Sequence, residues 1–565
     1  MINSIPPFLV FFVAAAFIPF LRGRLQQVLL ILVPLASAWN IIGIEQGVYW
    51  HLTVFGYAME PYRVDRLSLL FGYLFHIAAL ISIIFSLNVR DNVQHVSGLL
   101  YAGSALGAVF SGDLISLFIF WELMAVTSVF LIWARRTRRA IESGFRYLII
   151  QLGSGMLFLA GALLHIHKTG SLQFGYIGLG DLSSLLIFIA FGIKCAFPLL
   201  HNWLTDSYPE ATPTGTVFLS AFTTKVAVYS LARAFPGTEI LVYTGAVMTC
   251  FPIFYAVIEN DLRRVLGYSM INQLGFMVCG IGIGTALSIN GAVAHAFTDV
   301  IFKGLLFMSM GAVLHMTGRI NGSDLGGLYK TMPKTTVLCI IGAASISAFP
   351  LFSGFVSKSM VMAAALDEGY YWVWLALLFA SAGVFHHAGI KIPFFAFFAH
   401  DSGIRASDPP LNMLLAMSIA AFLCIFIGSY PWLLYSLLPN AVNYVPFDST
   451  HVLAQLQLLF FSALAFTWLK LSGLYPPELC SVNIDAEWIY RKFFPVFWLN
   501  LATLFNRIKS GTEKQTGKFT DIIASGLIRI YGIQGISSRT LQTDIVIILV
   551  LVFLTGYLLF YLISA

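Results

Sequence analysis

Ionisable side chains lie within long apolar stretches of this 565-residue chain, and glutamate, lysine and histidine are side chains that can exchange protons. A charged side chain inside a membrane costs about 3 kcal/mol or more unless it is paired or hydrated, so such residues usually serve ion or proton pathways. Their chemistry would be proton transfer from one buried group to the next. The candidates are Glu122, Lys194, Lys225, His295, Lys303 and Lys358, with His201, Asp299 and Lys391 as auxiliary candidates.

The spacing of these residues also allows purely structural roles. Glu122 and Lys194 have no opposite charge within one helical turn, so they must find partners on other helices. Asp299 and Lys303 are four residues apart, which places them on one helix face, where an ion pair could serve packing alone. Lys391 lies close to a helix end, where its ammonium group is expected to snorkel to the membrane surface.

A line of carboxylates, lysines and histidines is what a proton relay requires. Burial disfavours the charged forms of lysine and glutamate, and both groups can then exchange a proton near neutral pH. Histidine titrates in this range without help. His295 considered alone is nevertheless more typical of a histidine that hydrogen-bonds between helices.

Two short sequences indicate broken helices beside two of the lysines. AFPLL at 196–200 follows Lys194, and AFPLF at 348–352 precedes Lys358. Proline breaks a membrane helix, and broken helices at corresponding positions of two halves mark the substrate path of inverted-repeat transporters. The apolar spans around these two sequences form two groups of five, so the breaks are expected at opposite membrane polarity.

Membrane helices are the elements that would position these residues. The chain is 58% hydrophobic and 10% charged, whereas soluble domains carry about 25% charged residues. Its apolar runs are long enough to cross a bilayer about sixteen times. Basic residues concentrate in alternate loops, which places the N-terminus outside. We therefore predict an all-α polytopic protein of a bacterial or archaeal cell membrane, with two inverted five-helix repeats that contain broken helices.

Six regions follow from these spans. They are N-terminal helices (1–93), a first half-channel (94–234), a second, inverted half-channel (239–398), additional helices (411–473), a cytoplasmic lateral segment (475–540) and a C-terminal transmembrane helix (541–563). The lateral segment is mixed in charge and rich in aromatic residues, which is typical of an interfacial helix. It could be a docking arm for a partner protein or a surface linker, and the sequence favours neither.

Other kinds of chemistry are disfavoured. The six cysteines are scattered singly, without the CxxC or Cys/His spacing of zinc, haem or iron–sulfur sites. No GxSxG or phosphate-loop motif supports a membrane enzyme. The net charge of +6 is explained by basic loops, because no basic domain with interleaved aromatic residues suggests nucleic-acid binding. We expect no cofactor and no metal site.

Six motifs between about residue 60 and residue 400 occur in the order of a known family. They are DLISLFIFWELM, FGIKCAFPLLHNWLTDSYPEATPT, TTKVAVYSLAR, NDLRRVLGYSMINQLGFM, HAFTDVIFKGLLF and FPLFSGFVSK. The chain resembles the antiporter-like membrane subunits shared by complex I, membrane-bound hydrogenases and Mrp-type multisubunit Na+/H+ antiporters. It is most similar in appearance to the D-type Mrp subunit.

The resemblance implies roles for the matching positions. Glu122 would pair with Lys194 and modulate it. Lys225 would link the two half-channels, and Lys358 would be the exit group. Some family members have a second histidine where this chain has Asp299, a difference that bears on the relay and on ion selectivity. The family's proton-carrying positions correspond here to Glu122, Lys194, Lys225, His295, Lys303 and Lys358.

The sequence therefore predicts a proton-translocating subunit of a multisubunit Na+/H+ antiporter. Its expected partners are protons, a monovalent cation such as Na+, other membrane subunits and the lipid bilayer. A proton-pumping subunit of a complex I-like or hydrogenase-type respiratory complex is the first alternative, and in that case neighbouring subunits would carry any redox reaction. A scaffold that uses its buried charges only for packing is the second alternative.

Overall fold

The computed structural model describes residues 5–54, 56–476, 479, 483–511, 525–527, 529 and 543–564. The N-terminal elements are α1 (Pro7–Phe17), the 3-10 turn η2 (Ile18–Phe20), α2 (Gly23–Ile41), strands β1 (Gly47–Val54) and β2 (Tyr57–Val64), and α3 (Arg66–Ser86). The first five-helix unit contains α4 (Asn92–Phe110), α5 (Leu114–Trp133), α6 (Arg138–Thr169), α7 (Leu182–Lys194), α8 (Asn202–Ser207), η3 (Tyr208–Glu210), α9 (Gly215–Ala221) and α10 (Thr223–Ala234).

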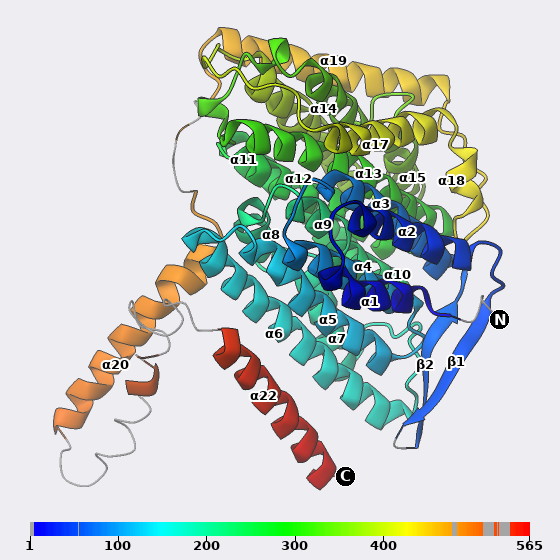
Figure 1. The fold of residues 1–565 in the computed structure, drawn as a ribbon, viewed down its shortest axis with the longest axis vertical. Helices are drawn as coiled ribbons and strands as arrows, with labels where there is room; N and C mark the ends of the chain where they lie inside the picture. Colours follow the sequence, from blue (N-terminus) through cyan, green and yellow to red (C-terminus); the bar gives the residue numbers. More distant parts are fainter. Residues whose placement is uncertain are drawn as a thin grey trace.

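The second five-helix unit contains α11 (Glu239–Ile258), α12 (Leu262–Ile283), α13 (Ala286–Thr317), η4 (Gly322–Asp324), η5 (Leu328–Lys330), α14 (Pro333–Ile346), α15 (Ser353–Asp367), α16 (Tyr371–Val384) and the π-helical η6 (Phe385–Lys391) and η7 (Phe394–Phe398). The described C-terminal elements are α17 (Leu411–Ser429), α18 (Trp432–Ser436), α19 (Ser449–Leu471), the π-helical η8 (Ile489–Phe493), α20 (Phe494–Gly511) and α22 (Thr543–Ser564). The helices up to α19 pack side by side in one body, whereas α20 and α22, orange and red in Figure 1, extend away from it.

The chain is a multi-pass membrane protein. Eleven helices of the described part are long and apolar enough to cross a bilayer, and four shorter apolar helices accompany them. The predicted all-α polytopic fold is confirmed. Fewer long helices are found than predicted spans, partly because α7–α8 and α14–α15 are single predicted spans that a break divides.

The two five-helix units repeat each other's local structure. Asp113 and Asp261 cap the N-termini of α5 and α12. Each also forms a β-bridge to a residue shortly after the next long helix, Asp113 to Gln173 and Asp261 to Asn321. These long helices, α6 and α13, both have 32 residues and both end at a left-handed glycine, Gly170 and Gly318. The two units therefore share the same order of local structural elements.

The breaks in α7–α8 and α14–α15 share an uncommon backbone conformation. Ala196 and Leu199 have positive φ in the first break, and Ala348 and Leu351 have positive φ in the second. Side chains with a Cβ rarely adopt this conformation, and it persists where the surrounding structure enforces it. The AFPLL and AFPLF sequences therefore encode the same helix break twice. The lysines differ in placement, because Lys194 ends α7 before its break and Lys358 lies in α15 after its break.

The antiparallel hairpin β1–β2 was not predicted. It lies between α2 and α3 at one edge of the body, where the N-terminus is also found (Figure 1). The Glu60 backbone N–H donates to Asp113 at 2.8 Å, so the hairpin is anchored beside the cap of α5. Two eight-residue strands outside the apolar runs leave no hydropathy signal, so hydropathy alone does not reveal the hairpin.

Much of the predicted lateral segment, 475–540, lies outside the described residues. Within its described part, η8 and α20 form a helix with exposed aromatic side chains, among them Trp488 and Phe494, 47% and 44% exposed. Such exposure suits a membrane interface or a partner protein. The position of this helix at the membrane surface stays a prediction.

Candidate functional site

Lys194 is fully buried at the last turn of α7. Its Nζ donates a 2.5 Å hydrogen bond to the backbone oxygen of Trp121 on α5 and lies 4.3 Å from the centre of the Trp121 ring. A carbonyl and an aromatic face both stabilise an ammonium group in apolar surroundings. Lys194 therefore faces the protein interior, as a proton carrier must.

Glu122 follows Trp121 on α5, and its carboxylate lies directly against Gly155 of α6. A Cβ atom at position 155 would overlap Glu122 Oε1, so only glycine leaves room for the carboxylate there. Glu122 Oε1 is buried without a hydrogen-bond partner among the described residues, and no ion pair within 4 Å joins Glu122 to Lys194. The two charges are still close enough to interact. The pair that the resemblance implies is thus open in this structure.

An ion pair connects the two five-helix units at the centre of the body. Lys225 Nζ on α10 lies 2.7 Å from Asp299 Oδ2 on α13, and both side chains are fully buried. The suggested pair of Asp299 with Lys303 is wrong. Lys303 Nζ instead donates to Ser269 Oγ at 2.8 Å, because Asp299 is turned toward α10, where Lys225 requires a counter-charge.

His295 and Lys358 lie within electrostatic range of each other in the second unit, and each has its own hydrogen-bond partners. The His295 ring is 3.0 Å from Ser357 Oγ and 3.1 Å from Gln273 Oε1. Lys358 Nζ donates to the Ile346 oxygen at 3.1 Å and lies 4.9 Å from the centre of the Phe276 ring. Like Lys194 in the first unit, this lysine is held by a backbone carbonyl and an aromatic face. For Lys358 the carbonyl belongs to the last residue of α14, at the helix break.

The buried ionisable groups form a seam that consists of a central cluster and an adjoining pair, Glu122 and Lys194. Asp299 lies within electrostatic range of Lys303 and Lys358 as well as of Lys225. The first unit approaches this cluster through Cys195, which follows Lys194 and is within range of Lys225. Five of the predicted residues therefore come together in the centre, while Glu122 and Lys194 form the adjoining group.

A cluster of buried hydroxyl groups lies in the first unit and was not found from the sequence. Tyr101 and Thr223 share a 2.6 Å hydrogen bond, and Ser128 and Tyr147 share one of 2.7 Å. Thr223 begins the helix that carries Lys225 two residues later. Tyrosine, serine and threonine are common in membrane helices, so their types alone could not reveal that these hydroxyls gather beside the lysine.

Lys391 has a different role from the one expected. It is fully buried, so the snorkelling prediction is wrong. Its Nζ donates to the oxygens of Ala256, Val257 and Glu259 at 3.3, 2.6 and 2.7 Å, where α11 ends. The last carbonyls of a helix have no partner within the helix, and a lysine can satisfy them. His201, a further auxiliary candidate, contacts Asp485 at 3.2 Å.

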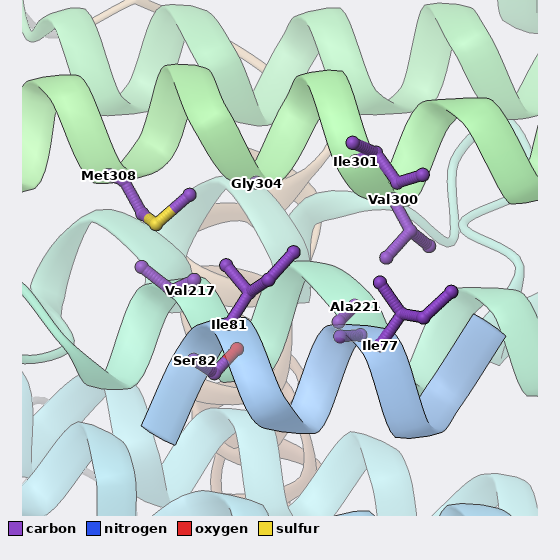
Figure 2. A pocket seen from close by; sticks show the side chains of 10 residues that line it. Ile77, Ile81, Ser82, Val217, Ala221, Val300, Ile301, Gly304 and Met308 are labelled. Carbon is purple, nitrogen blue, oxygen red and sulfur yellow. The ribbon is translucent and has the colours of Figure 1, made fainter. Parts of the chain in front are cut away.

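A small cavity lies between α3, α9 and α13 (Figure 2). Its lining is almost entirely apolar, with Ser82 as the one hydroxyl in it. Such a wall offers no group that carries a proton. In the part of the chain that the structure describes, no group of three or more His, Cys, Asp or Glu side chains could hold a metal ion.

The seam lies within a recognised membrane domain. A family profile described as "NADH:quinone oxidoreductase/Mrp antiporter, TM" matches residues 111–384, which include every candidate except Lys391. The D-type Na(+)/H(+) antiporter subunit of Alkalihalophilus pseudofirmus is 32% identical over 285 residues, 47% of this chain and 58% of that protein. The N-type NADH-quinone oxidoreductase subunit of Desulforudis audaxviator is 32% identical over 305 residues, 50% of this chain and 60% of that protein. The chain thus spans less than two thirds of each.

Among solved structures, the Mrp complex from Dietzia sp. contains a chain that superposes with a TM-score of 0.66 at 21% identity. The superposition covers 80% of this chain and 95% of that one, which establishes the fold. Residues 111–384 are therefore an antiporter-like transmembrane domain. Over this region the chain is similar to subunits of Mrp antiporters and of NADH-quinone oxidoreductase.

Proposed function

We propose that this chain is the proton-translocating subunit of a multisubunit monovalent cation/H+ antiporter. The observation that carries the proposal is the buried seam, in whose central cluster lysines, Asp299 and His295 from the two five-helix units lie within electrostatic range of one another. Isolated charges in hydrocarbon are costly, and a connected series of them has a use in proton transfer. Relatives named as Na(+)/H(+) antiporter subunits support the antiport role.

The mechanism follows from the two environments that Glu122 can give to Lys194. When the Glu122 carboxylate turns from Gly155 toward Lys194, its negative charge stabilises the ammonium form and holds the proton. When the carboxylate lies against Gly155, as in this structure, Lys194 keeps only a carbonyl and an aromatic face as partners. Its proton then passes more readily toward the central cluster.

The central ion pair transmits this step between the units. A proton that approaches Lys225 repels the positive charge of this lysine, because like charges repel. The ion pair between Lys225 and Asp299 is thereby weakened. Asp299 then stabilises positive charge on Lys303 or Lys358, which lie in its range. The charge thus moves toward Lys358 at the second break, where it leaves the seam. Asp299 accordingly replaces a family histidine as a fixed counter-charge that several lysines share.

Transport by membrane vesicles tests this proposal. Cells that express the full chain with its native partners are used to prepare everted vesicles, and cation-driven proton movement is followed with a pH-sensitive dye. Glu122→Ala and Lys194→Ala are expected to abolish transport at normal protein abundance. Glu142→Gln, which removes a carboxylate from the partly exposed ion pair with Arg138, serves as the matched control. Full transport by Lys194→Ala would refute the proposal.

A proton pump of a respiratory complex is the second candidate, because one relative is a subunit of NADH-quinone oxidoreductase. Purification in a mild detergent through a tag on this chain distinguishes the two. Copurifying subunits that contain flavin or iron–sulfur clusters would support the pump. A set of membrane subunits without redox centres, together with cation-dependent proton movement, would support the antiporter.

A further inference from the structure

The chain's own C-terminal segment contributes a buried carboxylate to the first unit. Asp485 is 8% exposed, and its Oδ2 accepts a 2.7 Å hydrogen bond from the Tyr268 hydroxyl. The same oxygen lies 3.2 Å from His201 Nε2. Tyr268 belongs to α12 of the second unit, and His201 precedes α8 of the first. A residue far along the chain is thus inserted where the two units meet.

Further polar contacts hold this segment, residues 483–491, on the body. Asn483 Nδ2 donates to Glu259 Oε2 at 3.1 Å. Arg491 pairs with Glu487 at 3.0 Å and approaches Asp206 at 4.0 Å. Because contacts lie on both sides of Asp485, the carboxylate is placed by the segment and does not reach the site as a flexible tail would.

His201 has the geometry of a proton carrier. The side chain is 2% exposed and its ring packs against Phe251, with ring centres 4.8 Å apart. Nε2 faces Asp485, while Nδ1 is buried and makes no hydrogen bond to any described residue. A carboxylate at Nε2 favours the tautomer with its proton there, which leaves Nδ1 as a free acceptor. Along the chain, only residues 195–200 of the break separate His201 from Lys194.

We propose that His201 takes up protons for the first unit at the α7–α8 break and that Asp485 positions it for this task. The inference rests on the proposed function. Nδ1 of the neutral ring accepts a proton, and the Asp485 carboxylate balances the imidazolium charge through Nε2–H. Nδ1 then releases the same proton toward Lys194 once that lysine has lost its own. The C-terminal segment is thereby part of the transport machinery and more than a brace or a linker.

Charged and titratable groups surround the pair from every element packed against it. They are Asp206 from α8, Tyr255 from α11 with Glu259 after it, Arg264 and Tyr268 from α12, and Glu487 and Arg491 from the segment itself. Positive and negative groups both contribute, so the local field does not by itself fix the charge of the ring. The hydrogen-bonded partner Asp485 is the group whose removal changes the environment of His201 most directly.

The test measures the transport rate of Asp485→Asn and His201→Gln in everted vesicles over a range of pH, normalised to protein abundance. Asp485→Asn is expected to lower the rate about tenfold or more and to displace the pH of half-maximal rate. His201→Gln should lower it at least as far, and the double variant no further than His201→Gln alone. Asp485→Glu should restore most of the rate, while the surface variant Glu142→Gln should behave as wild type.

Several results would overturn the inference. If Asp485 only braces the structure, Asp485→Asn should lower the rate by the same factor at every pH. That result would overturn the inference. Wild-type transport by His201→Gln would exclude the ring as a carrier. If the Asp485→Asn protein does not accumulate, the pH profile of Asp485→Glu tests the inference instead. Its carboxylate is moved by one methylene, so the pH of half-maximal rate must still be displaced. Loss of transport in Glu122→Ala with a normal Asp485→Asn would refute this inference alone, whereas normal transport by Glu122→Ala refutes both proposals.

Discussion

The ion pair between Lys225 and Asp299 gives the sharpest prediction, because the structural and the transport role of the pair can be separated. Asp299→Asn removes the negative charge and leaves Lys225 buried without its counter-charge. Lys225→Gln with Asp299→Asn removes both charges and keeps polar side chains of similar size. Packing requires that the two charges balance, and proton transfer requires that the ionisable groups exist.

The distance sets the magnitude. Two unit charges 2.7 Å apart attract by about 6 kcal/mol at an effective dielectric constant of about 20. Desolvation of two fully buried side chains offsets part of this attraction, and loss of one partner from a buried pair typically costs about 3–5 kcal/mol. We expect Asp299→Asn to lose stability in this range. The neutral double variant should regain most of it, because no uncompensated charge remains.

The assay has two readouts on the same preparations. Thermal unfolding of the purified protein in detergent reports stability, and cation-driven proton movement in vesicles reports transport. Asp299→Asn should be less stable and inactive, and the neutral double variant stable and inactive. Asp401→Asn is the control, since its ion pair with Arg405 is about half exposed and such pairs contribute about 0–1 kcal/mol. A stable double variant with wild-type transport would refute the relay.

Three further predictions concern other parts of the molecule. Gly155→Ala should slow transport at unchanged abundance by displacing the Glu122 carboxylate, whereas Gly153→Ala on the same helix, with open space at its Cβ, should not. Lys391→Met should lower the thermal unfolding temperature while transport per folded molecule is kept, because it leaves the last carbonyls of α11 without partners. Burial raises the pKa of Asp485, but hydrogen bonds from His201 and Tyr268 outweigh burial and hold this pKa below its usual value of 3.8. The carboxylate therefore stabilises docking of the 483–491 segment above about pH 4, and this stabilisation is lost as the pH falls through the folded-state pKa. Distances between spin labels on the segment and on α12 should stay constant from about pH 5 to pH 8, and a change within that range would contradict the assignment.

Sequence alone identified the membrane spans and most of the buried ionisable residues. Hydrocarbon imposes long apolar runs on a helix that crosses it, so each charge within such a run is visible against its surroundings. The two breaks were also readable, because proline has a defined effect on a helix, and Ala196 and Ala348 adopt the same backbone conformation in both. The family resemblance added roles to these positions that residue types could not supply.

The partner of each charge was decided by the tertiary structure. Spacing placed Asp299 beside Lys303, but the packing of α13 on α10 gave Asp299 to Lys225. Its position near a helix end suggested that Lys391 reaches the membrane surface. In the structure its ammonium group is buried against the carbonyls at the end of α11. The contact between His201 and Asp485 spans 284 residues of the chain. Linear sequence records which groups can ionise. Which of them meet depends on how helix faces are oriented around one another, and that orientation is a property of the packed bundle.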